Sequence, residues 1–452
     1  MPSNQLATFL GLVEEIFRPA LTRPGFANLL VVLLGWLLCH GPVHTITEAL
    51  VASGVAGQCH HEAFHRLFSR GAWSPDTVGY TLLRHLLKRS ASEPLRVVLD
   101  DTLASKKGPH IFGLGTHVDA VRSTRRWRIF SFGHCWLVLS VLVRVPFSSR
   151  PWALPFLFRL YRNRDDCASH DDPYQKKTEL AREMLTLLCA WTGETPIELA
   201  LDSAYCNETV LRSLPLRVTV FGTMRPDAVL TAAPEPPRAG RRRGGRPAKR
   251  GPKKPKPQEV ARDEQSPWRR CKAFLYGQVR TIRYKTLDAQ WYRVCGDRLL
   301  RIVIVETSTG ERPFRVFFCT DPTLAIATIL EGYAGRWNIE VFFRDAKQWL
   351  GFADSPARTE GAVLRMAPFV GLVYSTLVLW CAEGAYQSPL AAPPVRPWYR
   401  HKKNMSFPDI LRAAKRMLST VDVLALSCDY GKLRNRAVNR ATPEKRNLLL
   451  AA

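Results

Sequence analysis

Residues 95–102 read LRVVLDDT, an apolar and β-branched run that ends in two adjacent aspartates. Comparable runs follow at 134–145 (HCWLVLSVLVRV), at 196–205 (PIELALDSAY) and at 216–222 (LRVTVFG). Short runs of this composition predict buried strands of a central sheet. Between them, residues 174–193 show helical apolar spacing, so strands and helices mix within one region. The predicted fold class is therefore α/β, or α+β, with mixed elements.

The flanking stretches differ from this central region. Residues 1–90 show helical spacing interrupted by Pro, Gly and Ser, which predicts an N-terminal helical domain. Within it, HHEAFHRLFSRG (residues 60–71) is either a recognition helix for DNA or an ordinary packed helix. Residues 386–452 combine a Pro-rich linker with a helical region, in which a helix begins at Ser406.

A Pro-, Gly- and base-rich stretch interrupts the central region. Residues 238–256 contain ten Lys or Arg and no acid, and this composition predicts a flexible loop without a core. Strand-like runs resume afterwards (RTIRYKTLDAQWYRV, LLRIVIVETS and FRVFFCT), before helices return near residue 322. The predicted regions are a helical domain (1–90), the first part of the central core (91–233), a basic loop (234–260), an inserted β-rich module (261–320), the second part of the core (321–385) and a C-terminal region (386–452).

The charge of the chain indicates a polyanionic partner. Lys and Arg total 65 against 39 Asp and Glu, so the formal charge is +26. Nucleic acid is favoured over an anionic membrane surface, because the basic residues are spread along the whole chain instead of one amphipathic helix. The most apolar run, Phe26 to Cys39, is shorter than the roughly 20 residues that cross a bilayer. We expect no membrane partner.

The cysteines favour a reducing compartment. Their number is eleven, they show no paired framework, and no secretory leader is recognised at the start of the chain, so we expect a cytosolic protein. The cluster of Cys59, His60, His61 and His65 has the residue types of a zinc site, but no second ligand pair follows at zinc-site spacing. A helix without metal is the preferred interpretation.

Acidic residues mark the ends of two predicted strands and one predicted helix. Asp100 and Asp101 end the first strand, and Asp202 ends or closely follows another. The third acid is Glu340, in YAGRWNIEVFFRDAKQWLGF (residues 333–352). Two strand-borne aspartates and a glutamate offer hard oxygen ligands for a pair of Mg²⁺ ions, as phosphoryl transfer requires.

The same stretch also carries a phenol and two cations. Tyr333, Arg336, Glu340 and Lys347 are three, four and seven residues apart, so on one helix they would fall within roughly 60° of one face. Charged residues at these spacings also form the solvated face of many helices. The residues alone leave both interpretations open.

The pattern Tyr, two residues, Arg, three residues, Glu, six residues, Lys resembles the signature of cut-and-paste DDE transposases of bacterial insertion sequences. LDDT resembles the first-aspartate strand of that family, in which Asp precedes Thr, so the resemblance prefers Asp101 to Asp100. LALDSAY resembles the second-aspartate strand, with Asp202 in that role. The resemblance covers about residues 95–385 and implies an RNase H-like core in which a strand-rich module is inserted before Glu340.

The resemblance implies roles for the remaining residues. Asp101, Asp202 and Glu340 would be the catalytic metal ligands for two Mg²⁺ ions, with Mn²⁺ as a substitute. Tyr333, Arg336 and Lys347 would hold phosphates of the transposon end.

Two further residues are DNA-binding candidates. Trp291 is either a base-stacking aromatic or a core Trp on a strand. Arg246, in GGRPAKRG, is either a minor-groove hook or part of a non-specific polycationic tether.

The sequence therefore predicts a DNA transposase that cleaves and transfers strands by a two-metal mechanism. Its partners would be double-stranded DNA at terminal inverted repeats and target DNA, with a homodimer in the DNA complex, in the bacterial cytosol or nucleoid. The alternative is a transposase-derived DNA-binding protein without catalytic activity.

Overall fold

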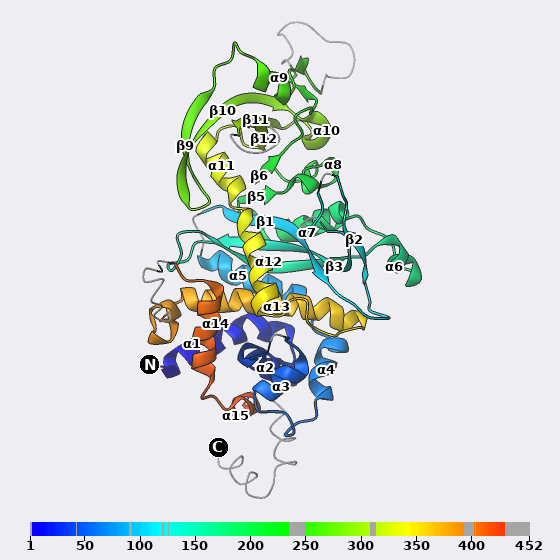
Figure 1. Cartoon of the computed structure of the whole chain (residues 1–452), viewed down its shortest axis with the longest axis vertical. Helices are drawn as coiled ribbons and strands as arrows, with labels where there is room; N and C mark the ends of the chain where they lie inside the picture. Colours follow the sequence, from blue (N-terminus) through cyan, green and yellow to red (C-terminus); the bar gives the residue numbers. More distant parts are fainter. Residues whose placement is uncertain are drawn as a thin grey trace, which may run out of the picture. The chain divides into compact units, whose positions relative to one another are not determined.

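The computed structural model divides into two compact units, each built from separate stretches of the chain (Figure 1). Unit 1 consists of residues 1–91, 101–175 and 340–452, and unit 2 of residues 92–100 and 176–339. The structure describes residues 2–41, 43–89, 93–119, 122–124, 126–234, 249–307, 313–392, 402 and 404–429.

Unit 1 begins with helices, as the spacing of residues 1–90 indicates. Thr22 and Thr45 begin two of them, each through a side-chain oxygen that accepts a backbone N–H of the first turn, from Gly25 and Glu48 respectively. The helices are α1 (Pro2–Phe17), α2 (Arg23–Leu38), α3 (Ile46–Ala52), α4 (Glu62–Ser69) and α5 (Pro75–Arg89).

The C-terminal part of unit 1 supplies its most apolar helix, α13 (Glu360–Ala382). This helix is long and apolar enough to cross a membrane by length and composition alone, but 89% of its most apolar window is buried among other residues. It packs on strand β4 (Trp152–Tyr161), where the Ser375 hydroxyl donates to the Pro155 carbonyl at 2.8 Å. It is therefore a core helix of unit 1.

The helix predicted to begin at Ser406 is α14 (Phe407–Leu418). The Ser406 hydroxyl and the Asp409 carboxylate form its capping box, with Pro408 in the first turn. A short helix, α15 (Val423–Cys428), follows. These features confirm how the helix begins.

The strands of unit 1 form an antiparallel arrangement beside the second half of β1 (Leu95–Ser105). They are β2 (Gly115–Val118), β3 (Phe130–Val143) and β4, and α6 (Arg164–Ser169) follows them. β3 runs opposite to β1, because the Lys106 amide donates to the Phe132 carbonyl while Cys135 contacts Asp101. β4 was not among the predicted strands.

Unit 2 holds the parallel strands. The first half of β1 pairs with β5 (Ile197–Leu201), and β5 pairs in parallel with β6 (Val218–Thr223). The chain crosses between strands through α7 (Lys177–Thr192) and α8 (Glu208–Leu211). Each of these strands coincides with one of the apolar runs that were predicted as strands.

The inserted strands join the same sheet as β6. β12 (Phe314–Cys319) pairs antiparallel with β6, and β11, β10 and β9 follow in order. The remaining elements of the insertion are β7 (Leu230–Thr231), β8 (Lys253–Lys254), α9 (Pro257–Arg262), β9 (Arg269–Leu275), β10 (Gln278–Gln290), α10 (Tyr292–Cys295) and β11 (Leu299–Glu306). The mixed α/β class with an inserted β-rich module is confirmed, while the proposed domain boundaries remain predictions.

The stretch predicted as one signature helix is two helices. α11 (Ile326–Ala334) ends just before Gly335, its C-cap, and α12 (Trp337–Trp349) begins two residues after that glycine. The amide of Arg336 donates to the Tyr333 carbonyl, three residues back, so the backbone tightens at this point. Glycine has low helix propensity, which explains why the break falls at Gly335. Tyr333 therefore lies on α11, while Glu340 and Lys347 lie on α12.

Candidate active site

Strands β1 and β5 place two aspartates at equivalent positions in unit 2, although β1 was predicted to end at Asp100 and Asp101 and instead continues to Ser105. Leu99 pairs with Leu201 in parallel register, so Asp100 and Asp202 are the next residues along adjacent strands. The carboxyl ends of parallel strands are where an open α/β sheet displays functional groups. Asp202 also begins a short 3-10 turn, Ser203–Tyr205. The register in unit 2 therefore concerns Asp100 and Asp202, whereas the predicted ligand Asp101 belongs to unit 1.

Arg336 contacts the first of these aspartates. Its guanidinium donates to the Asp100 carboxylate at 2.5 Å, and the two side chains are 15% and 14% exposed. An ion pair with so little solvent around it holds both groups in place more firmly than a surface pair. Arg336 is thus oriented by Asp100.

Tyr333 lies near the same groups. Its ring packs edge-on against Phe317 with centroids 4.9 Å apart, and the Arg336 guanidinium lies 6.0 Å from its centroid. Burial raises the pKa of the Tyr333 phenol, the Arg336 cation lowers it, and the negative charge of Asp202 raises it further. Tyr333, Arg336 and the two aspartates are therefore one electrostatic group within unit 2.

Lys347 contacts β1 within unit 1. Its amine donates to the Thr102 hydroxyl and to the Leu103 carbonyl, both at 2.7 Å. Burial lowers the pKa of this amine, while the charge of Asp119 raises it. These two hydrogen bonds use two of the three donors of the ammonium group. The structure adds an anchoring contact to the role that the sequence predicts.

The two adjacent aspartates have different partners. In a strand, Asp100 and Thr102 share one face and Asp101 points to the other. Asp101 accepts a hydrogen bond from the Cys135 thiol of β3, with 3.4 Å between sulfur and oxygen. The contacts of Arg336 and Lys347 thus involve Asp100 and Thr102, on one face of the strand, whereas the resemblance prefers Asp101.

Glu340 lies in the first turn of α12 and is half-buried. Its carboxylate, like those of Asp101 and Asp202, is the hard oxygen donor that Mg²⁺ prefers, so the donor types fit this ion. Across the described parts of the chain, no group of three or more His, Cys, Asp or Glu is close enough to hold a metal ion. Asp101 and Glu340 belong to unit 1, and Asp202 to unit 2.

The remaining two DNA-binding candidates are Trp291 and Arg246. Trp291 follows the end of β10 and precedes α10, where it is half-buried with its ring edge-on to Phe318 at 5.7 Å. It is therefore packed against the sheet but is not on a strand. Arg246 lies outside the described residues.

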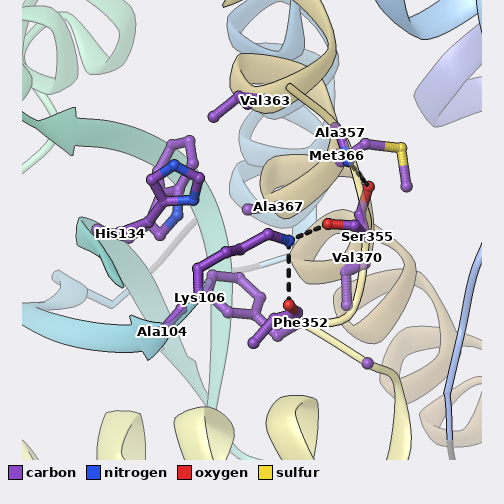
Figure 2. A pocket seen from close by; sticks show the side chains of 13 residues that line it. Ala104, Lys106, His134, Phe352, Ser355, Ala357, Val363, Met366, Ala367 and Val370 are labelled. Atoms are coloured by element: carbon purple, nitrogen blue, oxygen red, sulfur yellow. Dashed lines mark hydrogen bonds between the residues drawn. The ribbon is translucent and has the colours of Figure 1, made fainter. Parts of the chain in front are cut away.

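A small cavity in unit 1 is too confined to be a substrate site (Figure 2). Lys106 closes it by donating from its amine to the carbonyls of Ala353 and Ser355. His134 lines another side; its ring bonds the Phe112 carbonyl at 2.9 Å, and burial lowers its pKa to about 4. Through its two hydrogen bonds, Lys106 anchors the loop that follows α12.

The sequence did not indicate the Asp100–Arg336 pair or the contact of Lys347 with Thr102. A weak signal existed for each: a second aspartate next to the expected ligand, and a hydroxyl directly after it. Pairing over more than two hundred positions in sequence leaves no local pattern, so only the fold reveals it.

Among solved structures, the chain is similar to one described as a cryo-EM structure of a piggyBac transposase synaptic complex with hairpin DNA. The TM-score is 0.44 and the identity 9%, over 95% of this chain and 75% of that chain. No curated protein matches the chain.

A family model described as DDE superfamily endonuclease matches residues 17–288. This match includes Asp101 and Asp202 and ends before Tyr333 and Glu340. It extends over more than half of the sequence, so the chain belongs to the DDE superfamily endonuclease family.

Proposed function

We propose that the chain is a DNA transposase that cleaves and joins strands at transposon ends, with Asp101, Asp202 and Glu340 as metal ligands. The observation that carries the proposal is that Arg336 and Lys347 each contact β1 beside the aspartate pair, Arg336 at Asp100 and Lys347 at Thr102. Two motifs that were recognised independently in the sequence are thus connected by direct contacts. Family membership supports the endonuclease part of the proposal.

The three carboxylates would hold two Mg²⁺ ions, with Mn²⁺ as a substitute. When bound, such ions supply Lewis acidity and charge that stabilise the attacking and leaving oxygens of phosphoryl transfer. Asp101 lies within strand β1, Asp202 directly follows strand β5, and Glu340 lies in the first turn of α12, so each side chain begins on or next to a regular element. Ligands on regular elements need little reordering to bind.

The cations of the signature bind and orient DNA in this proposal. Arg336 is held by Asp100 in a setting of low exposure, so it meets a phosphate without first losing side-chain freedom. Lys347 is held by Thr102 and presents a point charge. Tyr333 stays protonated near neutral pH, because burial and Asp202 raise the pKa of its phenol, and it can donate to a phosphate oxygen.

The partners we propose are double-stranded DNA at terminal inverted repeats and target DNA, bound by a homodimer in the bacterial cytosol or nucleoid. The formal charge of +26 supports a polyanionic partner. The eleven cysteines, an odd number without a paired framework in the sequence, support a reducing compartment.

Glu340→Gln tests the proposal, because it keeps the side-chain size and removes one ligand charge. We expect strand nicking of a duplex that carries the element's own ends to fall at least a hundredfold in Mg²⁺, with end binding in a gel-shift assay unchanged. Glu360→Gln is the matched control, since Glu360 also lies in the first turn of a unit 1 helix. Nicking by Glu340→Gln at the wild-type rate would contradict the catalytic assignment.

Wild-type protein that binds these ends but does not nick them in Mg²⁺ or Mn²⁺ would identify the alternative, a transposase-derived DNA-binding protein. Binding and nicking are therefore measured on the same duplex and the same protein preparation.

A further inference from the structure

Strands β9 and β10 form a two-stranded hairpin at the edge of the unit 2 sheet (Figure 1). Leu275 pairs with Gln278, so only Tyr276 and Gly277 form the turn. Both have positive φ, 54° and 85°, which is the geometry of a tight type I′ turn. β9 pairs only with β10 among the described strands, so the hairpin is a ribbon with one free edge.

The two faces of this ribbon differ. One face packs on α11, where Ala273 is buried and the Glu331 carboxylate accepts the backbone N–H of Phe274 at 2.7 Å. The opposite face, here called the outer face, is exposed to solvent at every position. By cross-strand register the outer face consists of three pairs, Phe274 with Val279, Lys272 with Thr281, and Arg270 with Arg283.

The charge of the ribbon is of one sign. From Arg269 to Lys285 the sequence has six cations and no acid. Arg270 lies directly opposite Arg283, a like-charge arrangement that destabilises a sheet unless an anion is near. Arg283 has such an anion, Glu306 of β11, at 2.7 Å. Among the residues that the structure describes, Arg270 and Lys272 form no ion pair.

Edge protection alone does not explain the outer face. Charged residues on an edge strand do prevent strand-to-strand aggregation. The tip, however, exposes apolar side chains, since Phe274 is 44%, Tyr276 61% and Val279 68% exposed. A surface that combines unpaired cations with exposed aromatic rings is typical of a site that binds nucleic acid.

We infer that the outer face of the β9–β10 ribbon is a docking surface for duplex DNA, separate from the signature residues. The charge complementarity between Arg270 and Lys272, the cations of this surface that form no ion pair with any described residue, and a phosphate backbone carries the inference. The shape agrees, because the major groove of B-DNA, about 12 Å wide, admits a two-stranded β-ribbon. The inference rests on the proposed function, which makes DNA the substrate.

The first test measures affinity for a 40-base-pair duplex against salt, without divalent ions, for the full chain. Arg270→Gln with Lys272→Gln should lower the slope of log affinity against log salt by up to about 1.8, since each lost phosphate contact removes about 0.9. Arg164→Gln with Arg182→Gln, two exposed cations of α6 and α7, should leave the slope unchanged. Arg280→Gln, on the other face of the ribbon, should also leave it unchanged.

A wild-type slope in the Arg270 and Lys272 double variant overturns the inference, as does an equal loss in the Arg164 and Arg182 control. Wild-type protein that binds with a steep slope but does not nick contradicts only the proposed cleavage, because binding here is measured without metal. The two failures are therefore distinguishable.

A second test locates the contact directly. Benzoylphenylalanine in place of Phe274 should photo-cross-link to the labelled duplex, whereas the same replacement at Leu216, 87% exposed in unit 2, should not. Protein–protein adducts from position 274 in place of DNA adducts would assign the surface to a second copy of the chain and overturn the inference.

Discussion

Asp100 and Asp101 are neighbours in sequence with different partners, Arg336 and Cys135. We expect Asp101→Asn to abolish nicking, because the resemblance assigns it a metal, and Asp100→Asn to retain part of it. The reason for the partial loss is that Asn keeps an acceptor for Arg336 but not the charge that holds it. Nicking rates of both variants on the element's ends in Mg²⁺ provide the measurement.

A double-variant cycle separates the two roles of Asp100. If Asp100 acts only by holding Arg336, then Asp100→Asn added to Arg336→Gln lowers nicking no further than Arg336→Gln alone. A dead Asp100→Asn protein together with an active Asp101→Asn protein would reverse the assignment and make Asp100 the ligand.

At the scale of single residues, the sequence indicated the candidate residues better than the contacts that their side chains make. Asp202 was singled out because it ends or closely follows an apolar run, and in the structure it directly follows β5, which ends at Leu201. The sequence did not predict the Asp100–Arg336 pair, because adjacent residues of a strand point to opposite faces, and which of them forms the contact depends on the face that a distant segment covers. Lys347 was expected only to meet phosphate, and its bonds to Thr102 and Leu103 came from the fold.

At the scale of elements, the N-terminus of α14 gives a pH-dependent prediction. Burial raises the pKa of Asp409, but hydrogen bonds from Lys402, Ser406 and Arg412 outweigh it and lower the pKa to about 2. A carboxyl with a folded pKa below its unfolded value of 3.8 stabilises the protein above about pH 4. That contribution is lost as the pH falls from about 4 to about 2.

Asp409→Asn should therefore lower the free energy of unfolding by roughly 2 kcal/mol near pH 7 and make little difference near pH 2. Urea unfolding at several pH values provides the measurement. The control is Asp227→Asn, because Asp227 pairs with Arg225 at an exposed site where an ion pair contributes little. A pH-independent loss in Asp409→Asn would mean that packing, not charge, is what was removed.

Element prediction succeeded where one pattern dominated. The apolar runs at 95–102 and 299–306 lie in strands β1 and β11, because β-branched residues favour buried strands. Strand β4 was missed because Pro155 lies within it, and a proline lowers the expectation of a strand. The break at Gly335 was missed because spacing alone does not register a single tightened turn.

At the scale of the whole molecule, the strongly basic composition predicts steep salt dependence. Deleting residues 238–248 removes five cations and keeps Lys253 and Lys254, which pair with β7 as strand β8. We expect the slope of log affinity against log salt to fall by up to about 4.5, at about 0.9 per phosphate contact. Filter binding on random-sequence duplex provides the measurement.

The same deletion separates two roles for Arg246. A loss confined to A·T-rich duplexes would support the minor-groove hook, while a uniform loss supports a polycationic tether. An unchanged slope would show that the stretch is only a spacer and would contradict the prediction.

The division of the chain between two units has a consequence for biosynthesis. Unit 1 takes residues from both sides of unit 2 and needs α13, its buried core helix, which follows residue 340. During translation, the helices of residues 1–89 leave the ribosome long before the segment on which they pack. Such long-range closure is slow and exposes apolar surface in the meantime. We therefore expect that unit 1 folds only after most of the chain has been released, and that nascent chains halted before residue 340 are protease-sensitive and depend on chaperones.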